Sequence, residues 1–187
     1  MIKNAVELSH HYLKFFIKNG AFVVDATCGN GGDTVFLASL VGENGLVFGF
    51  DIQKEAIQNT KKRVENEGYS SFVQLFLDGH ENMEAYLGER KADAFVFNLG
   101  YLPKGDHTIH TKGETTIKAL EIALSHLSQN GIIALSIYHG GDSGFEERDA
   151  VLAYLEALDS KKYNVVLHNY INKPNFPPLF VLICHNQ

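Results

Sequence analysis

The sequence of 187 residues lacks the features of an extracellular or membrane protein. It has two cysteines, Cys28 and Cys184, which are too few for a disulfide framework, and neither has a neighbour at metal-ligand spacing. It also has no long uncharged apolar run and no apolar core of a signal peptide near its N-terminus. We therefore expect a soluble protein of the reducing cytoplasm with no membrane partner.

Positive charge is also scarce. Lysine and arginine together number 16 against 22 acidic residues, which gives a formal net charge of −6. Nonspecific attraction to a polyanion should be weak, so a nucleic acid must be met by a local group of basic residues. Hydrophobic residues make up 45% of the chain, and no repeat or low-complexity linker divides it. This composition predicts a single domain over 1–187.

Short apolar runs alternate with segments in which apolar residues return every three or four positions, which is typical of alternating strands and helices. Strands are expected at 21–26, 46–51, 72–77, 93–98 and 131–137, and helices at 4–18, 32–41, 53–67, 80–88 and 114–128. Helical crossovers of this kind predict parallel pairing. After a helix at 145–158, strands at 163–171 and 179–185 are joined by a segment too short for a crossover, which predicts an antiparallel C-terminal hairpin. We expect an α/β fold with a mostly parallel, seven-stranded sheet.

The most informative segment, 22–34, has the pattern of a buried strand, a glycine turn and the start of a helix. Glycines at positions 29, 31 and 32 let a ligand approach the backbone closely. Asp51 ends the next strand about twenty residues further on, where a carboxylate can accept hydrogen bonds from ribose hydroxyls. Together these residues predict a pocket for a nucleoside cofactor. For the glycines alone, a tight turn without a ligand is the alternative.

An acidic residue also ends the first strand. Asp25 lies four residues before Gly29, whereas the first glycine of a nicotinamide-binding fold follows the strand almost at once. With this order of elements, essentially the whole chain resembles the Rossmann-like fold of the class I S-adenosylmethionine-dependent methyltransferases. The resemblance implies S-adenosylmethionine as the cofactor, with the Asp25 carboxylate orienting its methionine portion. It implies cofactor contacts from Asp25, Thr27, Gly29, Asn30, Gly31, Asp33, Thr34, Asp51, Gln53, Asp78, Gly79, His80 and Asn98.

Two of these contacts have more specific expected partners. Asp51 is expected to hold the ribose hydroxyls, with Gln53 as a second polar contact. Asp78 ends the third expected strand and resembles the acid with which these enzymes recognise adenine. The alternative is that Asp78 caps the helix expected at 80–88, because aspartate often fills that position.

The fourth expected strand leads into Asn98, Leu99, Gly100 and Tyr101, where methyltransferases present the methyl acceptor. This stretch resembles the Asn/Asp-Pro-Pro-aromatic motif of enzymes that methylate amines on bases, with Leu99 and Gly100 replacing the prolines. The Asn98 side-chain oxygen and a loop carbonyl can hold the hydrogens of an amine whose lone pair points at the methyl group. Tyr101 would pack on a ring. Alternatively, Asn98 caps a turn and Tyr101 is an ordinary surface aromatic.

The sequences of several loops resemble those of one small family within this class of methyltransferases. The segment 98–106 (NLGYLPKGD), the pairs at 110–111 and 115–116 (HT and TT) and the segment 138–141 (YHGG) are similar to those of a small family of rRNA methylases. Members of that family act on tRNA and methylate the amine of 5-aminomethyl-2-thiouridine at the wobble position. The resemblance therefore implies this reaction and the tRNA anticodon loop as partner, and it suggests a homodimer.

Basic and histidine side chains on the loops after strands four, five and six offer local contacts to RNA phosphates. Substrate contacts are expected from Leu99, Gly100, Lys104, His110 and Arg148. Solvated loop charges are the alternative explanation for the charged members of this group.

His139 follows an apolar strand and is expected at the mouth of the site, where it can take the proton of an alkylammonium acceptor. Phosphate binding and loop capping are alternatives for this residue. His107, His110 and His139 raise the question of zinc, but no cysteine or acid is well placed to complete four ligands. We expect no metal.

Other functions remain open on the sequence alone. Within the same enzyme class, the acceptor can be rRNA or a small-molecule amine. A nicotinamide-dependent oxidoreductase is disfavoured by Asp25. A noncatalytic nucleoside-binding module would bind the cofactor without turnover.

Overall fold

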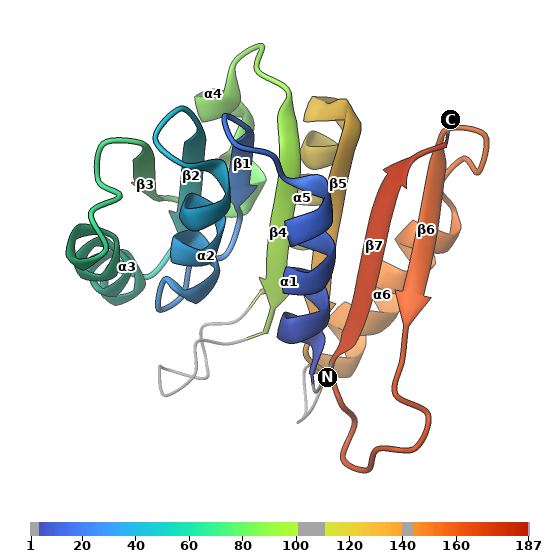
Figure 1. Cartoon of the computed structure of the whole chain (residues 1–187). Coiled ribbons are helices and arrows are strands. Elements are labelled where there is room, and N and C mark those ends of the chain that lie inside the picture. Colours follow the sequence, from blue (N-terminus) through green and yellow to red (C-terminus); the bar gives the residue numbers. More distant parts are fainter. Residues whose placement is uncertain (1–3, 101–110, 140–143, 187) are drawn as a thin grey trace.

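The computed structural model describes residues 4–100, 111–139 and 144–186. Its strands form one seven-stranded sheet in the order β3-β2-β1-β4-β5-β7-β6, with helices on both faces (Figure 1). The strands are β1 Phe22–Asp25, β2 Leu46–Asp51, β3 Val73–Leu77, β4 Ala92–Leu99, β5 Leu127–Ile137, β6 Tyr163–His168 and β7 Leu179–His185. The helices are α1 Ala5–Phe16, α2 Gly32–Val41, α3 Lys54–Asn66, α4 Glu84–Leu87, α5 Gly113–His126 and α6 Gly144–Glu156, with a 3-10 helix, η1, at His80–Asn82.

The sheet is parallel from β3 to β5, and β7 pairs antiparallel with both β5 and β6. The order of connection reverses between β1 and β4, which are neighbours in the sheet. In open α/β sheets, ligands bind outside the carboxyl ends of the strands at such a reversal. This edge is at the bottom of Figure 1, where the arrow of β4 ends.

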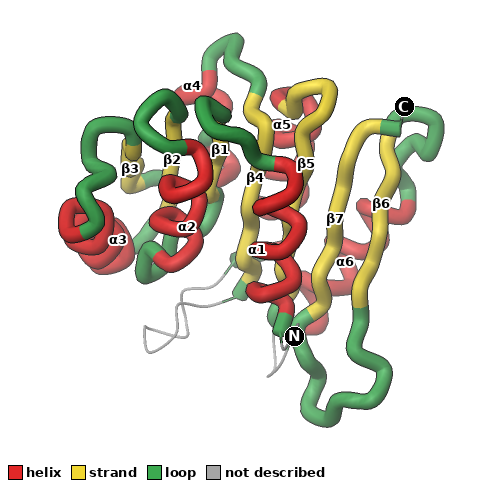
Figure 2. The backbone as a smooth tube through the Cα atoms, viewed as in Figure 1, coloured by secondary structure: helices red, strands yellow, loops and turns green. Residues whose placement is uncertain are grey.

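Two hydrophobic layers cover the sheet. Helices α1, α2 and α3 lie on one face, and α4, α5 and α6 lie on the other (Figure 2). The central strand β4 contributes to both layers, because Val96 packs with the first group of helices and Phe95 and Phe97 pack with the second. A parallel central strand buried on both faces is expected to be apolar along its whole length. Asn98, next to the carboxyl end of β4, is the first polar side chain after this run.

Every expected helix and strand is present, with ends that mostly agree within two residues, and three of them differ more than that. The helix expected at 80–88 is divided into η1 and α4, and Gly88, with a left-handed φ of 59°, follows its end. Strand β5 begins at residue 127 instead of 131, because Leu127 pairs with Ala92 across a register shift. Strand β6 ends at His168 instead of residue 171. Its partner β7 starts only after two prolines, which have no backbone N–H to donate.

Within the described ranges, no helix is long and apolar enough to cross a membrane.

Candidate active site

The turn between β1 and α2 is left-handed and closely packed. Gly29 and Gly31 have φ values of 53° and 77°, a conformation that glycine adopts without strain. A Cβ at Gly31 would lie 2.9 Å from Cα of Thr60 in α3. The Thr60 hydroxyl donates to the carbonyl of Gly29 at 3.0 Å, and Cys28 N donates to the carbonyl of Phe50 at 2.9 Å. The turn is therefore held against α3 and the end of β2.

Asp51, at the end of β2, connects this turn to the segment that leads into α3. Its Oδ2 accepts a hydrogen bond from Gly29 N and its Oδ1 accepts one from Gln53 N, both at 2.9 Å. Burial raises the pKa of Asp51 above its ordinary value, while these backbone donors act in the opposite direction. Each carboxylate oxygen can accept a second hydrogen bond. Ribose binding by Asp51 stays a prediction with suitable geometry.

Asp25 is completely buried under the turn. The Thr34 hydroxyl donates to its Oδ2 at 2.6 Å, and Thr27 N donates to its Oδ1 at 3.2 Å. Burial, followed by the negative charge of Asp33, raises the pKa of Asp25 to about 7. The carboxylate thus acts on the pocket through the shape of the turn and through its charge, and protein atoms enclose it.

Asn98 is held at both its backbone and its side chain. Its backbone N donates to the Thr27 hydroxyl at 2.7 Å, and its Nδ2 donates to Asp33 Oδ2 at 2.6 Å. The other carboxylate oxygen of Asp33 lies 2.6 Å from Nε2 of His10. The structure therefore brings Asn98, Thr27 and Asp33 together and adds His10 from α1. Sequence reasoning missed His10, because α1 has the amphipathic pattern of a packing helix.

Hydrogen bonds join the end of β4 to the segment before α5 and to α6. Gly100 N donates to the Thr111 hydroxyl at 2.8 Å, and Thr111 N donates back to the Gly100 carbonyl at 3.1 Å. The Thr111 hydroxyl in turn donates to Oε2 of Glu147 at 2.7 Å, and the Thr116 hydroxyl donates to Oε1 at 2.8 Å. Leu99 is buried, and its carbonyl accepts from Tyr138 N at 3.1 Å. Glu147 was not predicted from the sequence.

Tyr101, Lys104 and His110, which are predicted to act on the substrate, lie outside the described residues. His107, which was considered as a zinc ligand, also lies outside them. Among the residues that the structure describes, no group of three or more His, Cys, Asp or Glu side chains could hold a metal ion.

His139 and Arg148 belong to an aromatic cluster at the same edge of the sheet. The His139 ring is buried and packs edge-on against Phe145 and Phe176, with centroid distances of 5.9 and 6.2 Å. The Arg148 guanidinium lies 4.8 Å from the Phe145 centroid and forms an ion pair with Asp149 at 2.6 Å. His139 is thus enclosed by rings, whereas Phe176 is 63% exposed.

Asp78 makes local contacts but does not cap a helix, because the N-cap of η1 is Gly79 and no described side chain bonds to the free N–H groups there. Its carboxylate accepts from Gly79 N and from the Asn82 side chain at 2.8 Å, and from the Tyr86 hydroxyl at 2.7 Å. These hydrogen bonds, with that of Asn82 the largest contribution, lower the pKa of Asp78. Adenine recognition by Asp78 stays a prediction. His80 is buried with its ring edge-on to Phe97, and burial lowers its pKa.

Asn30 and Gln53 lie beside the glycine turn. The Asn30 side-chain oxygen accepts from Asn59 of α3 at 3.1 Å, and Gln53 immediately precedes α3. Both are therefore near Asp51, as the sequence predicts for residues of one pocket.

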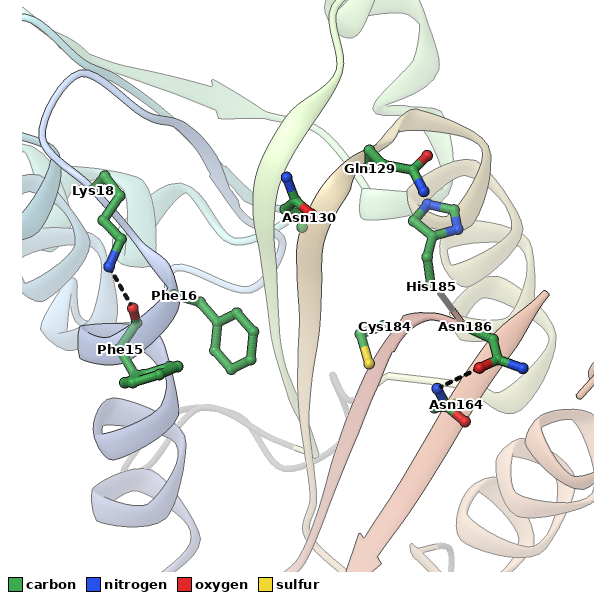
Figure 3. Close-up of a pocket in the computed structure, with 10 residues that line it drawn as sticks. Phe15, Phe16, Lys18, Gln129, Asn130, Asn164, Cys184, His185 and Asn186 are labelled. Carbon is green, nitrogen blue, oxygen red and sulfur yellow. Dashed lines mark hydrogen bonds between the residues drawn. The ribbon is translucent and has the colours of Figure 1, made fainter. Parts of the chain in front are cut away.

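A cavity of about 520 Å³ lies at the opposite edge of the sheet, between the end of α1 and the end of β7 (Figure 3). Phe15 and Phe16 line it on one side and Cys184 and Asn186 on the other. None of the expected site residues lines this cavity. The candidate site is therefore at the carboxyl ends of β1, β2 and β4.

The residues at this edge fit a cationic nucleoside cofactor. The negative charge of Asp33 and, to a smaller extent, that of Asp51 help burial to raise the pKa of Asp25, so both carboxylates lie close enough to act on it. Such a group of acids attracts a sulfonium or an ammonium. The remaining acceptor positions of Asp51 suit ribose hydroxyls.

Residues 47–184 match the model of the family described as "Putative rRNA methylase". Residues 4–87 also match the family "Protein-L-isoaspartate(D-aspartate) O-methyltransferase (PCMT)".

Two relatives show the range of similarity. The chain is 36% identical over 186 residues to the "tRNA (mnm(5)s(2)U34)-methyltransferase, chloroplastic" of Arabidopsis thaliana, covering 95% of this chain and 68% of the relative. It is 28% identical to the "Ribosomal RNA small subunit methyltransferase H" of Oceanobacillus iheyensis, covering 78% of this chain. In that second comparison the chain spans about half the length of the relative, 49%.

Two solved structures are similar to this chain over its full length. A "putative rRNA-methylase" from Clostridium thermocellum is 53% identical, with a TM-score of 0.97 and full coverage of both chains. A methyltransferase from Streptococcus mutans in complex with S-adenosylhomocysteine (SAH) is 37% identical, with a TM-score of 0.90 and full coverage of both chains. The cofactor of this fold is therefore S-adenosylmethionine, and the chain belongs to the rRNA methylase family of class I S-adenosylmethionine-dependent methyltransferases.

Proposed function

We propose that this methyltransferase transfers a methyl group to the amino group of 5-aminomethyl-2-thiouridine at the wobble position of tRNA, with the anticodon loop as its partner. The observation that carries this proposal is the 36% identity, over 95% of the chain, with a chloroplast protein named for methylation at U34. Family membership favours an enzyme over a noncatalytic module or a nicotinamide-dependent oxidoreductase.

When bound, the cofactor supplies an electrophilic methyl group. We assign its ribose to Asp51 and Gln53 and its adenine side to Asp78, Gly79 and His80. The turn residues Thr27, Gly29, Asn30, Gly31 and Thr34 would shape the pocket, with Asp25 buried beneath them. The acids at this edge would favour the cationic cofactor electrostatically.

The acceptor nitrogen is expected beside Asn98. The Nδ2 of Asn98 is occupied by Asp33, so its Oδ1 is the atom left to accept an N–H of the substrate. An amine held in this way points its lone pair along the line of displacement, and such positioning contributes a large share of the rate enhancement. In the same scheme Tyr101 stacks on the base, Lys104 and His110 contact the backbone, and His139 stays a candidate base.

The mouth of the site carries side chains of the kinds that bind single-stranded RNA. Phe176 is exposed, and its φ of 49° is rare for a bulky residue; such strain often marks a functional position. It packs at right angles to Phe145, with a centroid distance of 5.3 Å, and Arg148 lies over Phe145. Bases unstacked from a loop bind to aromatic faces and to arginine planes of this kind. Lys173, on the same loop as Phe176, lies over the Tyr170 ring.

We further propose that residues 1–187 act as one methyltransferase domain, since all described strands belong to one sheet. The homodimer and the cytoplasmic location stay predictions.

The substrate is tested with a panel of acceptors. The purified chain and S-adenosylmethionine are incubated with tRNA that carries 5-aminomethyl-2-thiouridine, with tRNA that lacks the aminomethyl group, with small-subunit rRNA and with the free nucleoside. We expect the methylated nucleoside by mass spectrometry only from the first tRNA. Methylation of the rRNA alone would favour the reaction of the Oceanobacillus relative and reject the proposed substrate.

A further inference from the structure

The Asp33 carboxylate at the start of α2 bridges two side chains from different elements. Its Oδ2 accepts the hydrogen bond of Asn98 Nδ2, and its Oδ1 lies against His10 Nε2, both at 2.6 Å. Asp33 is 12% exposed and His10 is 27% exposed, so solvent competes weakly for these contacts. Both oxygens of Asp33 are therefore already engaged by the protein.

We propose that Asp33, held by His10, is a positioning residue that fixes the orientation of the Asn98 amide toward the methyl acceptor. This inference rests on the proposed amine acceptor. It reassigns Asp33, which the sequence pattern places among the cofactor ligands, and gives a role to His10.

The orientation of the amide matters because its two ends have opposite effects on an amine. The oxygen accepts an N–H and leaves the nitrogen lone pair free, whereas the NH2 group donates to the lone pair and blocks its attack. An asparagine without neighbours can present either end. Since Asp33 accepts from Nδ2, Oδ1 is the end that remains for the acceptor.

His10 is itself fixed on two sides. Its ring stacks on Phe36 with a centroid distance of 3.6 Å and an angle of 8° between the planes. Phe36 and Asp33 are three residues apart on α2, so they lie on the same side of that helix. His10 therefore meets both residues from α1. The stacking contact thus restricts the plane of the ring beside Asp33.

The negative charge of Asp33 also favours methyl transfer, as does its hydrogen bond to Asn98. The acceptor enters as an ammonium and gives one proton to water or to the candidate base His139, and its nitrogen then bonds to the methyl carbon. The carbon–sulfur bond breaks, its electron pair stays on sulfur, and the positive charge passes to the nitrogen beside Asn98. A fixed carboxylate next to this position stabilises the developing charge. The field of Asp33 also reaches Tyr138 at the end of β5, where it adds to burial in raising the pKa of that phenol.

The orientation can be tested without any RNA. In the protein saturated with SAH, the side-chain amide of Asn98 is assigned by nuclear magnetic resonance from the signal that Asn98→Ala removes. We expect its hydrogens to exchange slowly in the native protein and at least about tenfold faster in Asp33→Ala, since exchange requires the hydrogen bond to open. Asp93→Ala is the matched control. Asp93 is a partly buried acid that also accepts two hydrogen bonds, from Phe22 N and Ser128, and should leave the Asn98 signal unchanged.

Kinetics separate positioning from cofactor binding. We expect kcat to fall about hundredfold in Asp33→Ala and about tenfold in Asp33→Asn, which keeps an acceptor but loses the charge, while SAH affinity stays within about threefold. His10→Gln, which can still donate to Asp33, should retain more kcat than His10→Ala. His11→Ala, at an exposed position on the same helix, is its control.

Three results would overturn the inference: unchanged exchange of the Asn98 amide in Asp33→Ala, a loss of SAH affinity that matches the loss of kcat, or native kcat in Asp33→Ala. If the native chain methylates no aminomethyl-thiouridine in tRNA, the proposed function fails, and the exchange measurement still decides the orientation of Asn98.

Discussion

The hydroxyl of Thr111 donates a hydrogen bond to Oε2 of Glu147 at 2.7 Å, which ties the segment before α5 to α6. The same hydroxyl accepts from Gly100 N, so one side chain joins the end of β4 to a buried carboxylate.

Thr111→Val is therefore expected to loosen the acceptor side of the site. The substitution preserves the shape of the side chain and leaves Gly100 N and Glu147 each without one hydrogen bond, a loss of about 1–3 kcal/mol of unfolding free energy. Chemical denaturation checks the stability, and calorimetry should show unchanged SAH affinity. Thr115→Val is the control, because the Thr115 hydroxyl bonds only to the local carbonyl of Lys112 among the contacts described.

Asp51→Ala should weaken SAH binding by about ten- to a hundredfold. Hydrogen bonds to a charged group contribute about 1.5–3 kcal/mol, and the carboxylate also holds Gly29 N in place. Calorimetry measures the affinity, and Glu55→Ala, an exposed acid in the first turn of α3, serves as the control. Native affinity in Asp51→Ala would remove the assignment of the ribose to this carboxylate.

The pKa of Asp25, raised to about 7, predicts how stability depends on pH. Because the folded state holds this proton more tightly than the unfolded state, the stabilisation is complete below about pH 4 and is lost as pH rises through about 7. Asp25→Asn removes this contribution. Raising the pH from about 4 to about 8 should therefore lower the unfolding free energy of the native protein by a few kcal/mol relative to that of Asp25→Asn.

Denaturant titrations at a series of pH values measure this difference in unfolding free energy. Because the difference is taken between two proteins, the contributions of their other titrating groups cancel. His80 is one such group. Its lowered pKa makes stability fall as pH drops through its ordinary value. A difference that does not change with pH would mean that Asp25 is ionised throughout.

Phe176→Ala should raise the KM for tRNA about tenfold and leave kcat and SAH affinity nearly unchanged. Stacking of a base on an aromatic ring contributes about 1–3 kcal/mol, and 63% of this side chain is exposed to solvent. Ile171→Ala removes another exposed apolar side chain from the same loop and is the control. Equal effects of both substitutions would point to a general loss of loop packing instead of stacking.

The fold was largely predictable because its signals are local. Apolar runs and helical periodicity identified every expected helix and strand, and the helical crossovers between strands predicted the parallel pairing. The limits of β5 and β6 could not be predicted, because each depends on the partner strand. Leu127 joins β5 only because Ala92 lies opposite, and β6 ends opposite the second residue of β7, a strand that follows two prolines.

The candidate site was predictable in part for the same reason. Asp25, Asp51 and Asn98 each lie near the carboxyl end of an apolar strand, and these ends of parallel strands meet at one edge. His10 and Glu147 gave no such signal, because each lies on a helix far along the chain from its partners. Only the packing of α1 on the sheet and of α6 beside α5 brings these two residues to the site.

The most direct test of the account is the nucleoside content of tRNA in cells that lack this protein. We expect 5-aminomethyl-2-thiouridine to accumulate, and the methylated form to return when the native chain is supplied but not when Asn98→Ala is supplied. Normal levels of the methylated nucleoside in the deleted strain, with no second enzyme for the reaction, would contradict the account.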